Sequence, residues 1–451
     1  MSTTVSAPRS TRRERWAWYL YDFGNSAYAA VVLLAIYSAY FKEEVVGGAE
    51  GSRFWGIAVG IAMLVVALTS PVLGTIADLS GVKKRFLFFY TAMACLFTAT
   101  LFFVQEGDVL IGMLFFILAE IGYRSGQVFY NALLPEIADP EEMGRVSGNG
   151  WAIGLIGGIV CLTLVLVLVT LFEGTWIVRL SLVITAVYFV LFASPLFLWL
   201  RERAQHEPMP PGESYLTIAF KRLGRTFRSV RRHGEFFKFI VAFLIYNDGV
   251  LMTVNFAAIF GAVMFGLDQQ QLIIFMIIVQ VTSVVGAYVS GVLADRIGGR
   301  TSLVIFILMM LAAVVGLFVN ETVTGFFVIG GIAGCALSAV QSVSRAMVAM
   351  LSPPRRSAEF YGFFAVAGRT SSFIGPTIYG WVAAEAAIWF AAQGEAASFL
   401  WFKAQEGGAP LAEQLGQRVA VLPVIAFLVV GLVLLLFVNE QRAAVGAKRE
   451  T

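Results

Sequence analysis

The chain has 451 residues, of which 59% are hydrophobic and only 14% are charged. Soluble domains carry roughly a quarter charged residues, so this composition excludes an ordinary soluble protein and indicates a polytopic membrane protein. The net charge of +3 gives no reason to expect nucleic acid as a partner. The basic residues stand in the connections between apolar segments, where they set membrane topology.

Apolar runs long enough to cross a bilayer recur along the chain. About twenty consecutive apolar residues span the hydrocarbon core as a helix, and the sequence lacks the alternating segments of a membrane barrel. Twelve helical spans are predicted, near residues 16–41, 54–77, 86–104, 109–134, 146–172, 176–200, 236–265, 271–293, 302–319, 323–351, 360–389 and 419–438. The predicted fold is all-α, with two six-helix bundles at residues 1–200 and 236–451 joined by a cytoplasmic linker at residues 201–235.

Lysine and arginine gather in every second connection, which the positive-inside rule assigns to the cytoplasm. Examples are Arg12, Arg13, Arg15, Lys83, Lys84, Arg85, Arg201, Arg203, Arg296, Arg300, Arg355 and Arg356. The alternate connections carry acidic residues such as Glu43, Glu106 and Glu321. Both termini are therefore expected in the cytoplasm, and the protein in the plasma (inner) membrane.

The linker combines a proline break, "EPMPPGE", with a basic amphipathic segment. Leu216, Phe220, Leu223, Phe227 and Val230 recur at helical spacing, and lysine and arginine fill most of the positions between them. Such a helix is expected to lie on the membrane surface, with its apolar stripe toward the bilayer and its basic residues toward anionic headgroups. The alternative is a merely solvated basic linker.

The two halves of the chain repeat each other. "GTIADLSGVKKR" follows the second predicted span and "GVLADRIGGR" follows the eighth, so that glycine, aspartate and basic residues stand at matched places. A six-helix repeat of this kind implies two bundles related by an axis along the membrane normal. In each loop the glycine permits close helix approach, and the aspartate can cap a helix or pair with an arginine across the bundle interface. We expect a conformational latch formed by Gly74, Asp78, Arg85, Gly291, Asp295, Arg296 and Arg300; the alternative is a pair of ordinary tight turns.

These loops resemble the hallmark of the major facilitator superfamily, although Leu79 and Ser80 depart from its usual pattern. Five further stretches resemble the vacuole-effluxer-like family, which includes the autophagy-related vacuolar amino-acid effluxer and bacterial permeases. They are "YDFGNSAY" (21–28), "YNALLPEI" (130–137), "GNGWAIGLIGG" (148–158), "YNDGV" (246–250) and "GRTSSFIGP" (368–376). The resemblance implies a secondary transporter but no particular substrate.

Two aspartates stand inside predicted spans at corresponding places of the two halves. Asp22 is flanked by Tyr21 and Asn25, and Asp248 by Tyr246 and Asn247. A charge at membrane depth is expensive and normally functional. In the resembling fold the first and seventh helices line the central cavity, so we expect these residues to exchange a proton or to bind a substrate ammonium. The alternative is that each carboxylate only joins neighbouring helices.

Further charges occupy the fourth, tenth and eleventh spans. Glu120 and Arg124 lie one helical turn apart and can neutralise each other, whereas Arg345 and Arg369 have no acidic partner within a turn of their own helices. A cavity with both signs of charge suits a zwitterion such as an amino acid. Interhelical charge pairs without a ligand are the alternative.

Glycine clusters such as Gly150, Gly154, Gly157 and Gly158, and the pair Gly375 and Pro376, are interpreted equally as hinges or as close-packing sites. Catalytic motifs and metal-ligand spacings are absent from the sequence, so neither an enzyme nor a cofactor is expected. The favoured hypothesis is a monomeric, proton-coupled carrier of a small organic solute that works by alternating access. A passive facilitator, a lipid flippase or scramblase, and a non-transporting receptor or scaffold remain as alternatives.

Overall fold

The computed structural model describes residues 10–79, 82–138, 143–172, 174–203, 214–351, 360, 363–364, 367–368, 373–393 and 408–439. Within this part, ten helices are long and apolar enough to cross a membrane. They belong to α3 (Glu50–Leu79), α4 (Lys83–Thr100), α5 (Val109–Ala132), α7 (Met143–Leu171), α8 (Thr175–Trp199), α10 (Gly234–Phe265), α11 (Gln269–Ile297), α12 (Gly299–Val319), α13 (Val323–Leu351) and α16 (Leu411–Leu435). The all-helical polytopic fold predicted from the sequence is confirmed.

The first predicted span is helical but alternates between α-helical and π-helical segments. It runs through α1 (Arg12–Tyr28), the π-helix η1 (Ala29–Ala35), α2 (Tyr37–Tyr40) and the π-helix η2 (Phe41–Val46). π-Helical turns are rare in proteins, and those that do occur are often found at functional sites. The eleventh predicted span, 360–389, lies partly outside the described residues, and α15 (Ile374–Gln393) covers the rest.

The last span begins earlier than the sequence suggested. Its predicted start at residue 419 is wrong, because α16 begins at Leu411 and includes Gln414, Gln417 and Arg418. These polar side chains are buried rather than placed in a connection. Arg418 donates hydrogen bonds to the carbonyl oxygens of Phe318 and Asn320 at the end of α12, so its charge is used to cap another helix.

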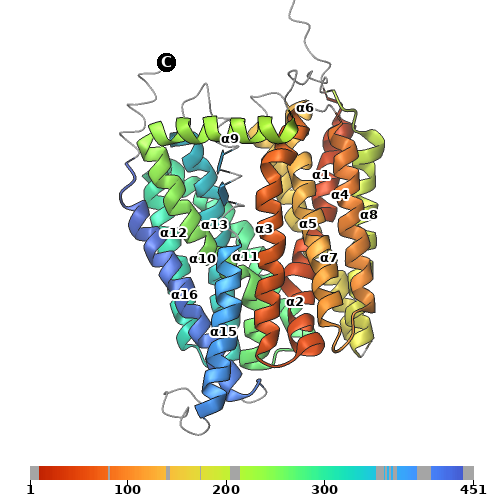
Figure 1. The fold of residues 1–451 in the computed structure, drawn as a ribbon, viewed down its shortest axis with the longest axis vertical. Helices are drawn as coiled ribbons and strands as arrows, with labels where there is room; N and C mark the ends of the chain where they lie inside the picture. The colour runs from red at the N-terminus through yellow and green to blue at the C-terminus, as the bar shows by residue number, and fades with distance from the viewer. Residues whose placement is uncertain are drawn as a thin grey trace, which may run out of the picture.

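The helices of the first half of the chain lie on one side and those of the second half on the other (Figure 1). The linker helix α9 (Tyr215–Arg232) lies across one end, nearly perpendicular to the long helices. We call this the linker end; it also carries the start of α1 and the short helix α6 (Leu134–Ile137). The opposite, or far, end carries α2 and the short 3₁₀ helix η3 (Leu101–Phe103), which follows α4.

Glycines of α7 bring that helix against α1. Side-chain atoms at position 150 would meet the ring of Trp18, and a Cβ at Gly157 would collide with the backbone of Phe23. At Gly154 a Cβ would lie 2.8 Å from Oδ2 of Asp22. Since α7 is an unbroken helix, these contacts favour close packing over a hinge at these glycines.

Replacing Gly157 with alanine should therefore destabilise the fold, because the new methyl group meets backbone that cannot rotate away. Overpacking of this kind costs about 1–3 kcal/mol. The melting temperature of the purified protein should fall. Gly316→Ala is the matched control, since a Cβ there would lie 3.5 Å from Ile329. Equal melting temperatures for the two variants would contradict the packing assignment.

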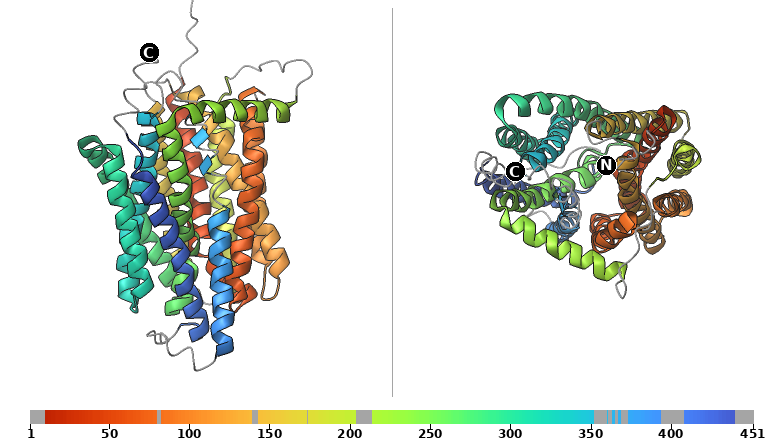
Figure 2. Two further views of the ribbon diagram at one scale, coloured as in Figure 1. Left: turned by 60° about the vertical axis from the view of Figure 1, so that its left-hand side comes forward. Right: turned by 90° about the horizontal axis from the view of Figure 1, so that it is seen from above.

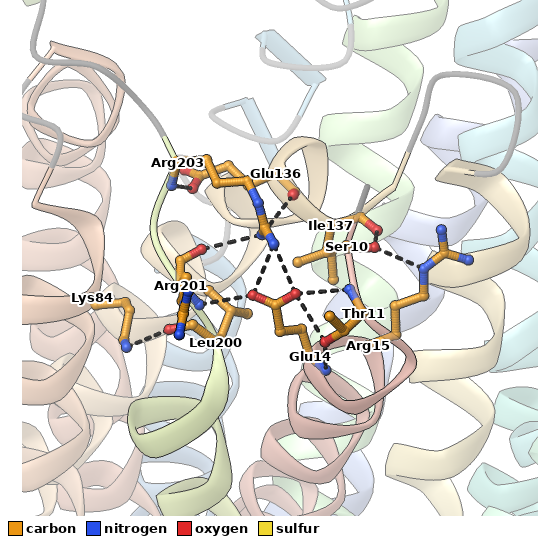
Figure 3. A network of polar contacts seen from close by, with 10 residues as sticks. All are labelled: Ser10, Thr11, Glu14, Arg15, Lys84, Glu136, Ile137, Leu200, Arg201 and Arg203. Atoms are coloured by element: carbon orange, nitrogen blue, oxygen red, sulfur yellow. Dashed lines mark hydrogen bonds and ion pairs between the residues drawn. The ribbon is translucent and has the colours of Figure 1, made fainter. Parts of the chain in front are cut away.

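A polar network joins the linker end of the first half (Figure 3). The buried carboxylate of Glu14 accepts hydrogen bonds from Nη2 of Arg203, from the Arg201 amide and from the Thr11 amide. Glu136 of α6 binds Nζ of Lys83 at 2.7 Å and the backbone amide of Arg203 at 2.7 Å. Basic residues that the sequence explains by topology alone thus also hold α1, α4, α6 and the start of the linker together.

Glu14 precedes the first membrane span, and its pKa reflects this network. Burial by itself raises the pKa of the carboxyl, but the hydrogen bonds from Arg203 and from the amides of Thr11 and Arg201 lower it to about 2. The charged form is therefore the one that the folded protein stabilises.

Replacing Glu14 with glutamine should lower the melting temperature at pH 7. A carboxyl whose pKa is lowered by folding stabilises the protein above its ordinary pKa of 4.5, and this contribution is lost as the pH falls toward 2. The difference between native and variant should therefore shrink at pH 3. Glu106→Gln, at an exposed position, is the control. A Glu14 variant as stable as the native protein at pH 7 would show that the network contributes nothing.

Candidate functional site

Asp22 lies where the two halves of the chain meet. Its carboxylate faces α7 at Gly154, and both the Asn25 side chain and the charge of Arg345 act on it. Arg345 belongs to α13 in the second half, and its guanidinium lies 4.8 Å from the ring centre of Trp151 on α7. Opposite charges from the two halves therefore approach each other beside an aromatic ring.

A second point of contact brings an amide of the second half against α1 and α7. A Cβ at Gly158 would lie 2.8 Å from Oε1 of Gln280 on α11 and 3.4 Å from the carbonyl oxygen of Ser26. Nε2 of Gln280 and Oδ1 of Asn25 are both buried without a hydrogen-bond partner in the described part of the chain. One donor and one acceptor thus stand unused in the region between the halves.

Asp248 occupies a different environment from Asp22. It is only 2% exposed, and its Oδ1 has no hydrogen-bond partner among the described residues. The neighbouring Asn247 accepts a hydrogen bond of 2.9 Å from Nε2 of Gln341 on α13. A buried polar atom without a partner costs free energy, so Asp248 is a strong candidate for ligand or proton binding.

The two tyrosines beside the aspartates point into bundle packing. The Tyr21 hydroxyl lies 2.8 Å from Oγ1 of Thr91, and the Tyr246 hydroxyl lies 2.7 Å from Oγ of Ser344. Both tyrosines are fully buried. Their hydrogen bonds stay within one half of the chain, so they position α1 and α10 against neighbouring helices.

The predicted pair of Glu120 and Arg124 is present. Nε of Arg124 lies 2.7 Å from Oε1 of the fully buried Glu120, and the guanidinium lies 5.1 Å from the ring centre of Tyr123. The Tyr28 hydroxyl lies close enough to the Glu120 carboxylate to interact with it, although no hydrogen bond of good geometry joins them in the described part of the chain. Both residues of the pair belong to α5, in the first half of the chain.

Several predicted residues cannot be placed. Arg369, and the side chains of Asp78 and Asp295, lie outside the described residues. Among the described residues, no atom lies within 4 Å of the position that a Cβ at Gly74 or Gly291 would take, and this does not test the close approach expected there. Arg85 and Arg296 are exposed, and Nη2 of Arg300 donates to the Leu436 carbonyl oxygen at 2.5 Å. The latch stays a prediction.

The two halves are tied together at the far end. Lys42 of η2 is only 1% exposed, and its Nζ lies 2.7 Å from Oε2 of Glu413 on α16 and 3.0 Å from Oε1 of Glu43. Nη2 of Arg53 on α3 lies 2.5 Å from Oε1 of Glu385 on α15. These ion pairs join the first half to the second and close this end of the interface.

A hydrogen-bonded chain continues the same closure inward. The Tyr379 hydroxyl donates to Oε1 of Gln417 at 3.0 Å, and Nε2 of Gln417 donates to Oγ of Ser52 at 2.7 Å. Nε1 of Trp55 donates to the Asn255 carbonyl oxygen at 3.1 Å. The backbones of α3 and α15 can approach closely here because Gly56 lies against Gly380 and Pro376.

A small cavity lies inside the second half, between α10, α11, α12, α13, α15 and α16. Its volume is about 80 Å³, and Leu34 of η1 also reaches it. The lining is apolar except for Thr253 and Tyr379, whose hydroxyls already bond to Gly249 and Gln417. A charged solute would find no partner there, so this cavity is not the candidate site.

Sequence reasoning missed three contributors to the interface. Gln280 is a single amide within an apolar run, Trp151 stands inside a quoted motif, and Lys42 is a lone basic residue in an acidic connection. Each of these residues differs in polarity or size from its neighbours in the sequence, and this difference could have identified it as a candidate. Gln341 and Glu413 gave no comparable signal, because only the packing of distant helices shows their partners.

These features define a class of protein. Two helical halves meet around charged groups at membrane depth and close at one end, which is the architecture of a major facilitator transporter. A bacterial homologue of the human lysosomal transporter Spinster, in an inward-facing and occupied conformation, matches with a TM-score of 0.69 at 16% identity over 96% of this chain and 97% of that one. A mutant form of the nucleoside transporter NupG matches with a TM-score of 0.68 at 16% identity, over 94% of this chain and 99% of that one.

The chain belongs to the family described as "Vacuole effluxer Atg22 like", whose profile matches residues 46–387. An uncharacterized MFS-type transporter, YxiO of Bacillus subtilis, is 30% identical over 82% of this chain and 88% of its own. Autophagy-related protein 22-1 of Aspergillus niger is 27% identical over 52% of this chain and 42% of its own. The protein is therefore an integral, multi-pass MFS-type transporter and not an enzyme.

The far-end ion pair should control access to the interface. Lys42→Met leaves the partly buried Glu413 without its partner, which destabilises the closed form and should favour opening of this end. We expect a cysteine placed at Thr377, which packs beside Gly60 of α3, to react on the order of tenfold faster with a water-soluble thiol reagent. The background variant has Cys95, Cys161 and Cys335 replaced by alanine.

Lys238→Met provides the matched control, because Lys238 pairs with Glu235 at 2.9 Å within one helix. That variant should leave the reaction rate at position 377 unchanged. An unchanged rate in the Lys42 variant as well would mean that the ion pair does not hold the far end closed.

Proposed function

We propose that this transporter is a proton-coupled carrier of a small zwitterionic solute, with an amino acid favoured, and that it works by alternating access. The observation that carries the proposal is that Asp22 and Arg345, from opposite halves of the chain, lie against neighbouring turns of α7, at Gly154 and at Trp151. The family description names an effluxer, which is consistent with a carrier. The basic residues predict that the linker end faces the cytoplasm.

The side chains at the interface match the two ends of a zwitterion. A carboxylate such as Asp22 binds an ammonium group, and a guanidinium such as Arg345 binds a carboxylate through charge-assisted hydrogen bonds. The unused acceptor of Asn25 and the unused donor of Gln280 offer further contacts for a small polar molecule. Because these groups come from both halves, a bound solute would link the halves and favour their joint movement.

Coupling to protons is assigned to Asp22, with Asp248 as the second carboxylate. Both stand at a depth where an idle charge is expensive, and the sequence offers no nucleotide-binding motif that could supply energy. In the cycle that we propose, the far-end pairs of Lys42 and Arg53 break when that end opens. The glycine and aspartate loops at the linker end would then close, so that the latch at Asp78 and Asp295 forms in the opposite conformation.

The decisive variant is Asp22→Asn. It should abolish accumulation driven by a pH gradient in proteoliposomes and retain exchange of solute across the membrane, because exchange does not require the empty carrier to return without its proton. Asp248→Asn should reduce accumulation less if Asp248 mainly positions the solute. The solute used is the amino acid that most raises the melting temperature of the purified protein in a screen.

Asp108→Asn, in a connection at the far end, serves as the control, and size-exclusion profiles confirm folding of each variant. If Asp22→Asn accumulates solute normally with an unchanged pH profile, the coupling assignment fails. If even the native protein equilibrates solute without responding to the gradient, it is a passive facilitator of the same fold.

A further inference from the structure

The linker helix α9 holds a fixed place at the edge of the molecule. It begins after Ser214, whose Oγ accepts a hydrogen bond of 3.2 Å from the Thr217 amide. The two views of Figure 2 show it lying across the linker end along the outside of the long helices. It packs against α3 of the first half and α10 of the second, so it bridges the two halves at this end.

The apolar residues of α9 divide into two groups. Ile218 and Val230 are buried against the protein. Leu216, Phe220 and Phe227, at spacings that place them on one helical face, are 57%, 55% and 45% exposed. Leu216 and Phe220 are therefore more than half exposed. Phe227 remains partly exposed although its ring centre lies 6.3 Å from those of Phe237 and Phe363.

The rest of the exposed surface of α9 is basic. The exposed cationic side chains are Lys221, Arg225, Arg228, Arg231 and Arg232. The helix itself contains no acidic residue. Its surface therefore offers a strip of positive charge beside a strip of apolar side chains.

The position of α9 fixes the depth of these two strips. The membrane-spanning helix α10 begins at Gly234, directly after α9 ends at Arg232. With 32 residues, α10 is longer than the hydrocarbon core requires. Its first turns, and α9 directly before them, are therefore expected at the level of the lipid headgroups. Amphipathic basic helices at this level bury their apolar face at the acyl boundary and bind anionic headgroups with their charges.

We propose that α9 is a binding surface for anionic phospholipids. A bilayer surface satisfies both strips of the helix at once, whereas an acidic soluble protein would match the charges and leave the membrane-level aromatic side chains unexplained. Because α9 packs against both α3 and α10, lipids that bind it stabilise the arrangement in which both contacts exist. The proposal does not depend on which solute the transporter carries.

The test uses the full chain purified in detergent and titrated with phosphatidylglycerol or phosphatidylcholine of identical acyl chains. A lipid that binds only the folded protein raises its melting temperature. We expect a larger rise with phosphatidylglycerol than with phosphatidylcholine, and a smaller difference in 0.5 M salt because exposed charges are screened over about 4–5 Å at that ionic strength. The variant Arg225→Gln/Arg228→Gln should lose at least half of the difference.

Two further variants make the result specific. Arg12→Gln/Arg201→Gln removes the same charge from exposed positions at the same end but outside α9, and it should keep the full difference. Arg225→Lys/Arg228→Lys retains the charge and should keep it too, which separates lost binding from misfolding. The proposal is overturned if the two lipids act equally on the native protein, if the α9 variant responds like the native protein, or if the control loses the response equally. If the two lipids act equally on the native protein, an acidic protein becomes the favoured partner of α9.

Discussion

Inside a bilayer no water is available to satisfy a polar group, so every such group must find its partner within the protein. The placement of polar side chains in this transporter follows from that constraint. Arg124 pairs with the buried Glu120, Lys42 with Glu413, and Arg418 donates to carbonyl oxygens at the end of α12. Some buried polar atoms have no partner among the described residues: those of Asn25, Asp248 and Gln280, and also Oε2 of Glu120 and the hydroxyl of Tyr28. The first three are the ones that the proposed function uses.

The same constraint explains why the halves close at one end with polar contacts. Apolar surfaces gain little by leaving lipid, so helices in membranes associate through close packing and hydrogen bonds. At the far end, Gly56 and Gly380 permit the backbones of α3 and α15 to touch. The hydrogen bonds from Tyr379 to Gln417 and from Gln417 to Ser52 fix how these helices are oriented. Contacts of this kind are specific when formed, and the proposed cycle would break them together.

Several charged residues of the candidate site stand out in the sequence because charge at membrane depth is conspicuous. Four residues were identified only because an ionisable side chain at membrane depth is energetically expensive: Asp22, Asp248, Glu120 and Arg345. The tyrosines beside the aspartates show the limit of this approach. Tyr21 and Tyr246 are adjacent to the site in sequence, but a helix turns by about 100° per residue and directs their hydroxyls into their own bundle.

The sequence by itself indicated a polytopic helical protein, the approximate bounds of most spans, the internal repeat and the resemblance to a transporter family, because these depend on hydropathy and local motifs. Twelve spans were predicted, and ten helices of the described residues are long and apolar enough to cross a membrane. Only the tertiary structure decided that Gln280 faces Gly158, that Lys42 pairs with a residue of α16, and that α16 begins at Leu411. The physical reason is that a polar side chain in a membrane helix is energetically tolerable mainly when another group of the protein pairs with it. For Lys42 and Gln280 that partner lies on a helix far away in the chain, where no local pattern records it.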